Sequence, residues 1–370
     1  MEILFVHLLN NYTGSPRILS NILDAFSNRD DVRIHLLTSF SEGCLSEHGN
    51  VIYHNNHYKW SASRIHLAWN LVISHIYQFC FILFSRNYDL VYVNTILPFG
   101  AAFAAKLRGM KIIYHIHEYY PNPSVMQKIC VFFTKKCASR IVFVSEYVKS
   151  SYGEKFAYNK NVIYNSVSKQ FHDVAEKISL TDDVLTHRYE SRKIIMPCAL
   201  KKYKGVLEFV KLAEKLPDFF FELILSNSEE ETKQFFKDMQ LPMNLCLRNE
   251  IKDMTKIYEQ ASLVMNLSIP HGIDRIIETF SMILLEGFEF GLPCLAPNYG
   301  GPKELIEDGK SGFLIETLDT KKVIEKLRCF FSDFSAYKRF SLCAKERSLL
   351  FSNEKFSDAI KNEIEEETNE

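Results

Sequence analysis

The sequence predicts an α/β protein with two Rossmann-like domains, each built on a parallel sheet that helices cover on both faces. Three observations favour this fold class. The 370 residues exceed one ordinary compact core and suit two domains. Short β-branched and aromatic runs alternate with helical stretches, which is typical of βαβ units. Several of these runs are apolar throughout instead of alternating, as expected for central parallel strands.

The first half of the chain contains seven expected strands, separated by helical stretches. They are residues 3–7, 32–38, 50–54, 90–94, 111–117, 140–144 and 161–164. The segment 168–192 is polar and mixed, so we expect a linker there, with one short helix as an alternative. In doubly wound sheets, ligands bind beyond the carboxyl ends of the strands. Functional residues are therefore expected where these strands end.

The second half repeats the alternation with six expected strands. They are residues 193–197, 219–225, 244–247, 263–267, 293–296 and 312–315. A helical stretch covers about 336–350, and the acidic tail beyond Asn353 is expected to be frayed and solvated. The sequence thus predicts one domain over 1–170, a second over 171–335 and a helical segment over 336–370.

Charge and cysteine content exclude several classes of protein. The net charge is -1, whereas a dedicated nucleic-acid-binding protein should be strongly basic, so no nucleic-acid partner is expected. The nine cysteines show no CxxC spacing, so neither a zinc knuckle nor a redox pair is indicated. A reducing compartment follows from this cysteine usage. The first residues include no basic leader, so we expect no secretion signal and a cytoplasmic location.

The most informative stretch runs from Glu278 to Gly301. Ser281 is a good N-cap for the apolar helix that follows, and Gly291 is a good stop signal. The N-terminus of such a helix offers unpaired N–H groups and a positive dipole end, which suit an anion. Glu278 lies just before this N-terminus. Glu286 lies inside the apolar run, where a carboxylate needs a partner such as a sugar or ribose hydroxyl.

Glu278 and Glu286, separated by seven residues, resemble the EX7E signature of retaining glycosyltransferases of the GT-B fold, family 4, also called group 1 glycosyl transferases. The segments 291–293, 300–304 and 308–314 continue the same pattern in register. The resemblance implies two Rossmann-like domains that face a cleft, the first on the acceptor side and the second on the donor side. It also implies that the C-terminal helices of 336–370 return to the first domain.

Three further places resemble the same family in the right order. Gly14, in Thr13-Gly14-Ser15-Pro16-Arg17, resembles the first loop that approaches the donor phosphates. His117, followed by Glu118, resembles the histidine that lies near the transferred sugar. Lys204, in the segment 200–205, resembles the cation that neutralises the diphosphate. The family's arginine is replaced by Ala199, and Lys201 or Lys202 could supply that charge.

The resemblance implies a mechanism that needs no metal or other cofactor. Lys204, the Gly14 loop and the N–H groups of Ser281, Met282 and Ile283 would stabilise the diphosphate leaving group. Glu278 would hold sugar hydroxyls, Glu286 the ribose, and His117 would touch the sugar near the reacting centre. Four residues are additional candidates for the site, namely Arg17, Lys201, Lys202 and Glu118. The implied reaction is retaining transfer of a hexose from a nucleotide-diphosphate donor to a glycan or lipid-linked acceptor, in surface polysaccharide or glycoconjugate biosynthesis.

Other functions stay open at this point. A nucleotide-sugar epimerase of the same fold would bind the donor but need no acceptor. A catalytically silent nucleotide- or glycan-binding protein is supported by Ala199, although Lys204, Glu278, Glu286 and His117 are all present. A dinucleotide-binding dehydrogenase is disfavoured because no GxGxxG follows any expected strand. His271 and Arg275 are interpreted as solvated charges.

Two helices of the first half suggest a peripheral contact with an anionic membrane. Residues 127–140 mix lysines with phenylalanines, as amphipathic helices at membrane surfaces do. Residues 67–84 form an apolar run that Asn70, Ser74, His75 and Gln78 interrupt, so a membrane span is disfavoured. The alternative is that both helices simply pack on the sheet.

Overall fold

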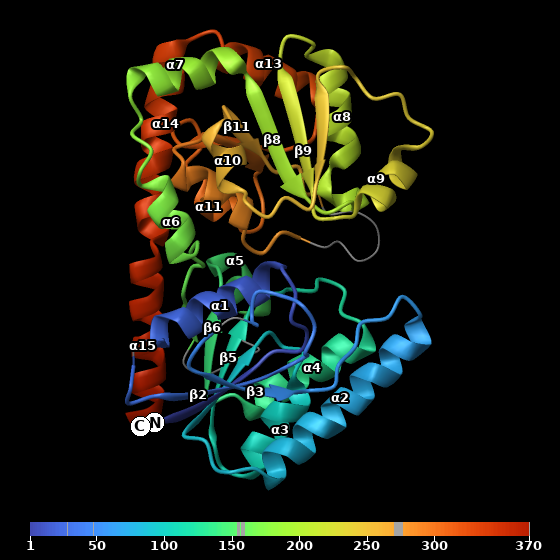
Figure 1. The fold of residues 1–370 in the computed structure, drawn as a ribbon, viewed down its shortest axis with the longest axis vertical. Helices are drawn as coiled ribbons and strands as arrows, with labels where there is room; N and C mark the ends of the chain where they lie inside the picture. Colours follow the sequence, from blue (N-terminus) through green and yellow to red (C-terminus); the bar gives the residue numbers. More distant parts are fainter. Residues whose placement is uncertain (28, 47, 154–155, 157–159, 270–276, 370) are drawn as a thin grey trace. The chain divides into compact units, whose positions relative to one another are not determined.

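The computed structural model describes residues 1–27, 29–46, 48–153, 156, 160–269 and 277–369. These residues form two compact units (Figure 1). Domain 1 consists of Met1–Ser166 together with Asn353–Glu370, and domain 2 of Val167–Ser352. All nine cysteines are free thiols.

Domain 1 contains a parallel sheet of seven strands in the order β3-β2-β1-β4-β5-β6-β7. The central strands are buried nearly throughout, because helices cover both faces of the sheet. The strands are β1 (Glu2–Val6), β2 (Arg33–Thr38), β3 (Val51–Asn55), β4 (Leu90–Asn94), β5 (Lys111–Ile116), β6 (Arg140–Phe143) and β7 (Lys160–Val162).

The helices of domain 1 pack in two layers. On one side α2 contacts α3 and α3 contacts α4, while α1 contacts α15 on the other (Figure 1). The helices are α1 (Gly14–Phe26), α2 (Arg64–Phe84), α3 (Phe99–Leu107), α4 (Val125–Cys137), α5 (Glu146–Tyr152) and α15 (Asn353–Asn369). Within the described residues, Ile65–Phe84 of α2 is the one helical segment long and apolar enough to cross a membrane. That criterion uses length and composition alone, and a core helix can also satisfy it.

A buried ion-pair cluster fixes α15 to the sheet of domain 1. Arg140 on β6 is 3% exposed and contacts Glu363 at 3.2 Å, Glu366 at 2.7 Å and Glu367 at 3.3 Å. Asn161 donates a further hydrogen bond to Glu363. The prediction of a frayed, solvated tail is therefore wrong, since three acidic side chains of α15 contact a buried arginine.

Domain 2 contains a parallel sheet of six strands in the order β10-β9-β8-β11-β12-β13. The strands are β8 (Lys193–Cys198), β9 (Phe220–Leu225), β10 (Leu245–Asn249), β11 (Leu263–Met265), β12 (Cys294–Pro297) and β13 (Gly312–Ile315). The helices are α6 (Lys169–Ala175), α7 (Asp182–Ser191), α8 (Val206–Lys215), α9 (Glu229–Phe236), α10 (Thr255–Glu259), α11 (Met282–Glu289), α12 (Pro302–Leu305), α13 (Thr320–Phe330) and α14 (Phe334–Ser348).

The thirteen expected strands are all present, each within two residues at either end. The region 168–192, expected to be a linker that can include a short helix, contains two helices, α6 and α7, whose N-caps are Ser168 and Thr181, so it is more regular than predicted. The C-terminal segment that returns to domain 1 begins at Asn353, later than the predicted start at residue 336. Helix α14 belongs to domain 2, where it contacts α11, and only α15 belongs to domain 1.

Candidate functional site

In domain 2, charged and polar side chains meet beyond the carboxyl ends of β8 and β11. Lys204 lies in the loop after β8, and its Nζ is 2.6 Å from Oε2 of Glu278. The hydroxyl of Ser268, which follows β11, donates to the same carboxylate oxygen at 3.1 Å. The Lys204 and Glu278 side chains are each 23% exposed, so solvent or a ligand can still reach them.

Close backbone packing sets the position of Lys204. The next residue, Gly205, has φ +74° and lies against Leu267, where a Cβ would come within 2.4 Å of the leucine Cβ. Burial lowers the pKa of Lys204, but the Glu278 carboxylate outweighs burial and leaves this pKa above its usual value. The ammonium group is therefore charged at neutral pH and available to an anion.

The N-terminus of α11 lies in the same part of domain 2. Ser281 is its N-cap residue, as expected, but its hydroxyl makes no capping bond and instead accepts a hydrogen bond from Asn266 at 2.8 Å. Met282 and Ile283, in the first turn, are half-buried. The first N–H groups of a helix have no intrahelical partner and carry the positive end of the dipole. An anion-binding helix end thus accompanies the Lys204 ammonium.

Two glycines allow the segment that carries Glu278 to lie close to the chain after β12. The N–H of Gly301 donates to the carbonyl of Glu278 at 2.8 Å. A Cβ on Gly300 would lie 2.4 Å from that carbonyl oxygen, and one on Gly301 would lie 2.4 Å from Cα of Phe280. Both contacts involve backbone atoms, so larger residues here would displace Glu278 or α11.

Glu286 is buried at 8% exposure inside α11 and has a partner within the protein. The hydroxyl of Tyr258, on α10, lies 2.5 Å from Oε2 of Glu286. This tyrosine meets the need of the buried carboxylate for a hydrogen-bond donor within the protein itself. The role of Glu286 toward a ribose stays a prediction.

In domain 1, three polar side chains meet where β1, β4 and β5 end. Nε2 of His117 lies 2.8 Å from Oδ1 of Asn94, and Nδ2 of Asn94 lies 3.0 Å from Nδ1 of His7. Asn94 Nδ2 also donates to the carbonyl of Ser15 at 3.0 Å. That bond orients the amide, because a carbonyl oxygen can accept only from the NH2 group. Oδ1 of Asn94 therefore accepts from His117, so His117 carries its proton on Nε2.

Burial keeps these histidines neutral. It lowers the pKa of His117 well below its usual value, and the nearby His115 and His7 lower it further. Burial likewise lowers the pKa of His7 to about 4. The cluster thus contains an oriented, uncharged imidazole, whose single ring proton is directed at Asn94.

Glu118 is the titratable group next to this cluster. Its carboxylate accepts hydrogen bonds from the N–H groups of Ile96 at 2.9 Å and of His117 at 3.1 Å. Burial raises its pKa to about 7, and the backbone hydrogen bonds oppose this effect only in part. Glu118 is therefore poised to exchange a proton near neutral pH.

The remaining predicted residues lie at the edges of these two clusters. Gly14 starts α1 and is exposed, with no atom within 4 Å of a Cβ placed on it, and Arg17 is also exposed. The Ser15 contact brings this helix start next to Asn94. Lys201 and Lys202 are exposed in the loop that carries Lys204. His271 and Arg275 lie outside the described residues.

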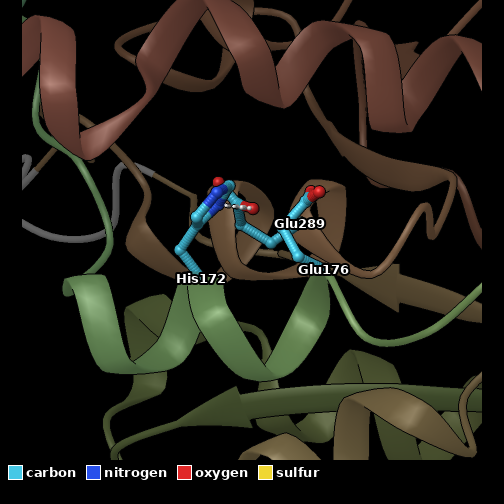
Figure 2. A group of neighbouring side chains, drawn as sticks. All are labelled: His172, Glu176 and Glu289. Atoms are coloured by element: carbon cyan, nitrogen blue, oxygen red, sulfur yellow. Dashed lines mark hydrogen bonds and ion pairs between the residues drawn. The ribbon is translucent and has the colours of Figure 1, made fainter.

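A third polar cluster in domain 2 has side chains that could ligate a metal ion. Figure 2 shows His172 of α6 and Glu176, the C-cap residue of α6, beside Glu289 of α11, with their ligand atoms within 4.8 Å of one another. Nδ1 of His172 bonds Glu289 at 2.8 Å. The ammonium of Lys345 on α14 already contacts both carboxylates, Glu176 at 2.6 Å and Glu289 at 3.9 Å. This cation offsets part of the negative charge of the cluster, and we interpret the cluster as a set of polar contacts that join the helices.

Sequence reasoning missed five residues of the two clusters. They are His7, Asn94, Tyr258, Asn266 and Ser268. Four of them lie at or just beyond the carboxyl end of an expected strand, which is where ligands bind in doubly wound sheets. That position was the signal that could have identified them, whereas Tyr258 lies on a helix and carries no such signal.

Two family models match successive parts of the chain. The model described as Glycosyltransferase Family 4 matches residues 12–171. The model described as Glycosyl transferases group 1 matches residues 179–347. An uncharacterised glycosyltransferase of Methanocaldococcus jannaschii is 24% identical over 99% of this chain and 98% of the relative. Another, from Haemophilus influenzae, is 23% identical over 68% of this chain and 69% of the relative.

Solved structures with the same architecture cover nearly the whole chain. Anabaena HepE in complex with UDP and glucose has a TM-score of 0.74 at 18% identity, over 98% of this chain and 99% of its own. Sucrose-phosphate synthase from Thermosynechococcus elongatus has a TM-score of 0.76 at 12% identity, over 99% and 98%. These likenesses show the two-domain Rossmann-like GT-B fold, as predicted. The two family matches, which together span most of the chain, identify it as a group 1 glycosyltransferase.

Proposed function

We propose that this glycosyltransferase moves a hexose from a nucleotide-diphosphate donor to a glycan or lipid-linked acceptor, with retention of anomeric configuration and without a metal. The observation that carries the proposal is the Lys204–Glu278 pair beside the N-terminus of α11. The cation and the N–H groups suit a diphosphate, and the carboxylate suits sugar hydroxyls. The arrangement therefore fits a sugar attached to a diphosphate.

The cation and the helix end would act on the leaving group. As the bond between the sugar and the diphosphate breaks, negative charge grows on the phosphate oxygens. The Lys204 ammonium and the N–H groups of Ser281, Met282 and Ile283 would stabilise this charge from fixed positions, so they can take the place of a metal ion. The Gly14 loop, with Arg17, would approach the phosphates from domain 1. Lys201 or Lys202 would supply the positive charge that the family's arginine provides and Ala199 lacks.

The carboxylates and the imidazole would orient the sugar and the nucleoside. Glu278 accepts hydrogen bonds, so it would hold sugar hydroxyls once a diphosphate attracts Lys204 away from it. Glu286 would hold the ribose beside the hydroxyl of Tyr258. His117, neutral and oriented by Asn94, would contact the transferred sugar, with Glu118 next to it as a proton acceptor.

Uridine diphosphate sugars are the first donors to test, because HepE is described in complexes with UDP and with UDP-glucose. The acceptor and the pathway, surface polysaccharide or glycoconjugate assembly in the cytoplasm, rest on analogy within the family. The free thiols of all nine cysteines support a reducing compartment.

Thermal stabilisation by nucleotide diphosphates and nucleotide sugars, with and without EDTA, tests the donor site. A ligand present at about 100 times its Kd should stabilise the folded state by ~2.7 kcal/mol. We expect a shift for one base that EDTA does not change. Lys204→Met should lose it, whereas Lys211→Met, at an exposed lysine of α8, should keep it. A shift that requires a divalent metal would contradict the proposal.

Product analysis separates the remaining alternatives. Incubation with the stabilising donor and candidate acceptors should give a product whose anomeric configuration, measured by NMR, matches that of the donor. An isomerised donor formed without any acceptor would instead identify an epimerase. Absence of any nucleotide-dependent shift in a folded sample would favour the silent binding protein.

A further inference from the structure

We propose that one helical face of domain 1, formed by α2, α3 and α4, is a docking surface for an anionic lipid bilayer. The central observation is an apolar stripe along α2. Ile65, Trp69, Ile73, Ile76 and Phe84 are between 52% and 82% exposed. Most of these residues follow one another at intervals of three or four, so they lie along one side of the helix.

The opposite side of α2 is fixed to domain 1 by polar contacts. Ser74 Oγ donates to the carbonyl of Asn56 at 2.8 Å, and Gln78 Nε2 donates to Ser74 at 2.9 Å. Nδ1 of His75 accepts from the N–H of Gly100, at the start of α3, at 3.3 Å. A helix held along one side in this way lies on the domain, so it would contact a bilayer from its surface instead of crossing it.

The neighbouring helices extend the apolar surface. Helix α3 lies next to α2, and α4 lies next to α3 (Figure 1). Ring contacts join α3 and α4: the centroids of the stacked rings of Phe99 and Phe133 are 5.0 Å apart, and those of the tilted rings of Phe103 and Phe133 are 5.1 Å apart. We define the α2–α4 face by its exposed apolar residues. They are Ile65, Trp69, Val72, Ile73, Ile76, Phe84, Phe103, Leu107, Val125, Ile129 and Phe132.

Charge identifies the partner that suits the α2–α4 face. None of the three helices contains an aspartate or glutamate, although the chain has 45 such residues. Lys106, Lys128, Lys135 and Lys136 are exposed on α3 and α4. Apolar and aromatic side chains interspersed with cations match an anionic lipid surface, where the rings enter the interface and the lysines meet the headgroups.

A second copy of the chain fits this surface less well than a bilayer does. A symmetric dimer would place the same patch against itself. The lysines of α3 and α4 would then face one another, with no acidic residue in these helices to compensate their charge. A bilayer supplies both the apolar interior and the negative charge, and it would hold a membrane-linked acceptor near the enzyme.

Vesicle flotation tests the inference with the full-length protein. We expect it to float with phosphatidylcholine vesicles that contain about one third phosphatidylglycerol, and far less with phosphatidylcholine alone. Each lysine near an anionic surface contributes about fivefold in affinity, so Lys135→Glu with Lys136→Glu should weaken binding more than 25-fold. Ile73→Glu with Ile76→Glu should abolish it. The matched control is Met243→Glu, at a fully exposed apolar residue of domain 2.

Four results would overturn the inference. They are equal flotation with neutral vesicles, unchanged flotation of both double variants, resistance to alkaline carbonate extraction, and a dimer that Ile73→Glu with Ile76→Glu converts to a monomer. The substituted side chains are exposed, so the variants should keep the wild-type melting temperature. The inference does not depend on the proposed donor chemistry. Vesicle binding by a protein without transferase activity would contradict the proposed function and support the docking surface.

Discussion

The substitution Glu118→Gln should make the stability of domain 1 less dependent on pH. Glu118 lies beside His117, and burial raises its pKa from the ordinary value of 4.5 to about 7. A glutamine has nearly the same shape and can still accept a backbone hydrogen bond, but it has no proton to lose. The comparison between wild type and variant therefore isolates the titration of this one carboxyl group.

The magnitude follows from the difference between the folded and unfolded pKa values. Below pH 4.5 Glu118 is protonated in both states and contributes nothing. Between pH 4.5 and 7 the unfolded chain has already released the proton that the folded protein retains, so stability falls as the pH rises. The full cost above pH 7 is about 3 kcal/mol, at ~1.4 kcal/mol per pH unit. Relative to wild type, the variant should gain this amount between pH 4.5 and 8.

Thermal unfolding at pH 5, 6, 7 and 8 measures the effect. For a domain of this size, about 3 kcal/mol corresponds to a change of roughly 6–12 °C in the difference between the two Tm values. Glu42→Gln, at an exposed carboxylate of domain 1, provides the matched control and should show no such trend. A Tm difference for Glu118→Gln that stays constant with pH, or that moves in wild type's favour at high pH, would refute the reasoning.

Three further substitutions test the packing around the clusters. Asn94→Leu removes the partner that orients His117, so kcat should fall about 100-fold with little change in donor KM; an equal rise in KM would indicate general damage. Arg140→Met leaves buried carboxylates of α15 unpaired and should cost about 3–5 kcal/mol in urea unfolding, whereas a loss below ~1 kcal/mol would contradict a buried cluster. Gly301→Ala forces a Cβ against the backbone of Phe280, so we expect a loss of about 1–3 kcal/mol and a weaker donor-induced Tm shift. An unchanged shift would show that this close approach does not position Glu278.

The strands could be predicted because their signal is local. In β4 and β13 a short apolar run bounded by polar or glycine residues is sufficient, and both strands have the predicted bounds. Helix α7 also carried a local signal that was overlooked, since Thr181 is followed by two acidic residues in the first turn. The packing of α15 on domain 1 was expected from the family resemblance alone, because no local signal indicates it. Its glutamates meet Arg140, more than 220 positions earlier in the chain.

The same distinction between local signals and long-range contacts applies to the site. Lys204 and Glu278 were each predicted as site residues, and their contact brings together positions that are 74 residues apart. The amide of Asn94 and the hydroxyl of Tyr258 were not predicted, because each acts through a partner on a distant element. Residue types and spacing thus identify the groups that carry charge, while the groups that orient them depend on tertiary packing.

The position of α15 determines the order in which the two domains can fold during synthesis. Domain 2 is continuous over 167–352, whereas domain 1 needs a helix that follows all of domain 2 in the chain. A nascent chain can therefore complete domain 2 first. Until α15 is synthesised, Arg140 and the side of α1 that α15 covers lack their contacts with this helix. The two ends of domain 1 where the chain is interrupted lie together, with Asn353 Nδ2 3.4 Å from Ser166 Oγ. A short glycine linker from 166 to 353 would make domain 1 a contiguous polypeptide that no longer depends on this delay.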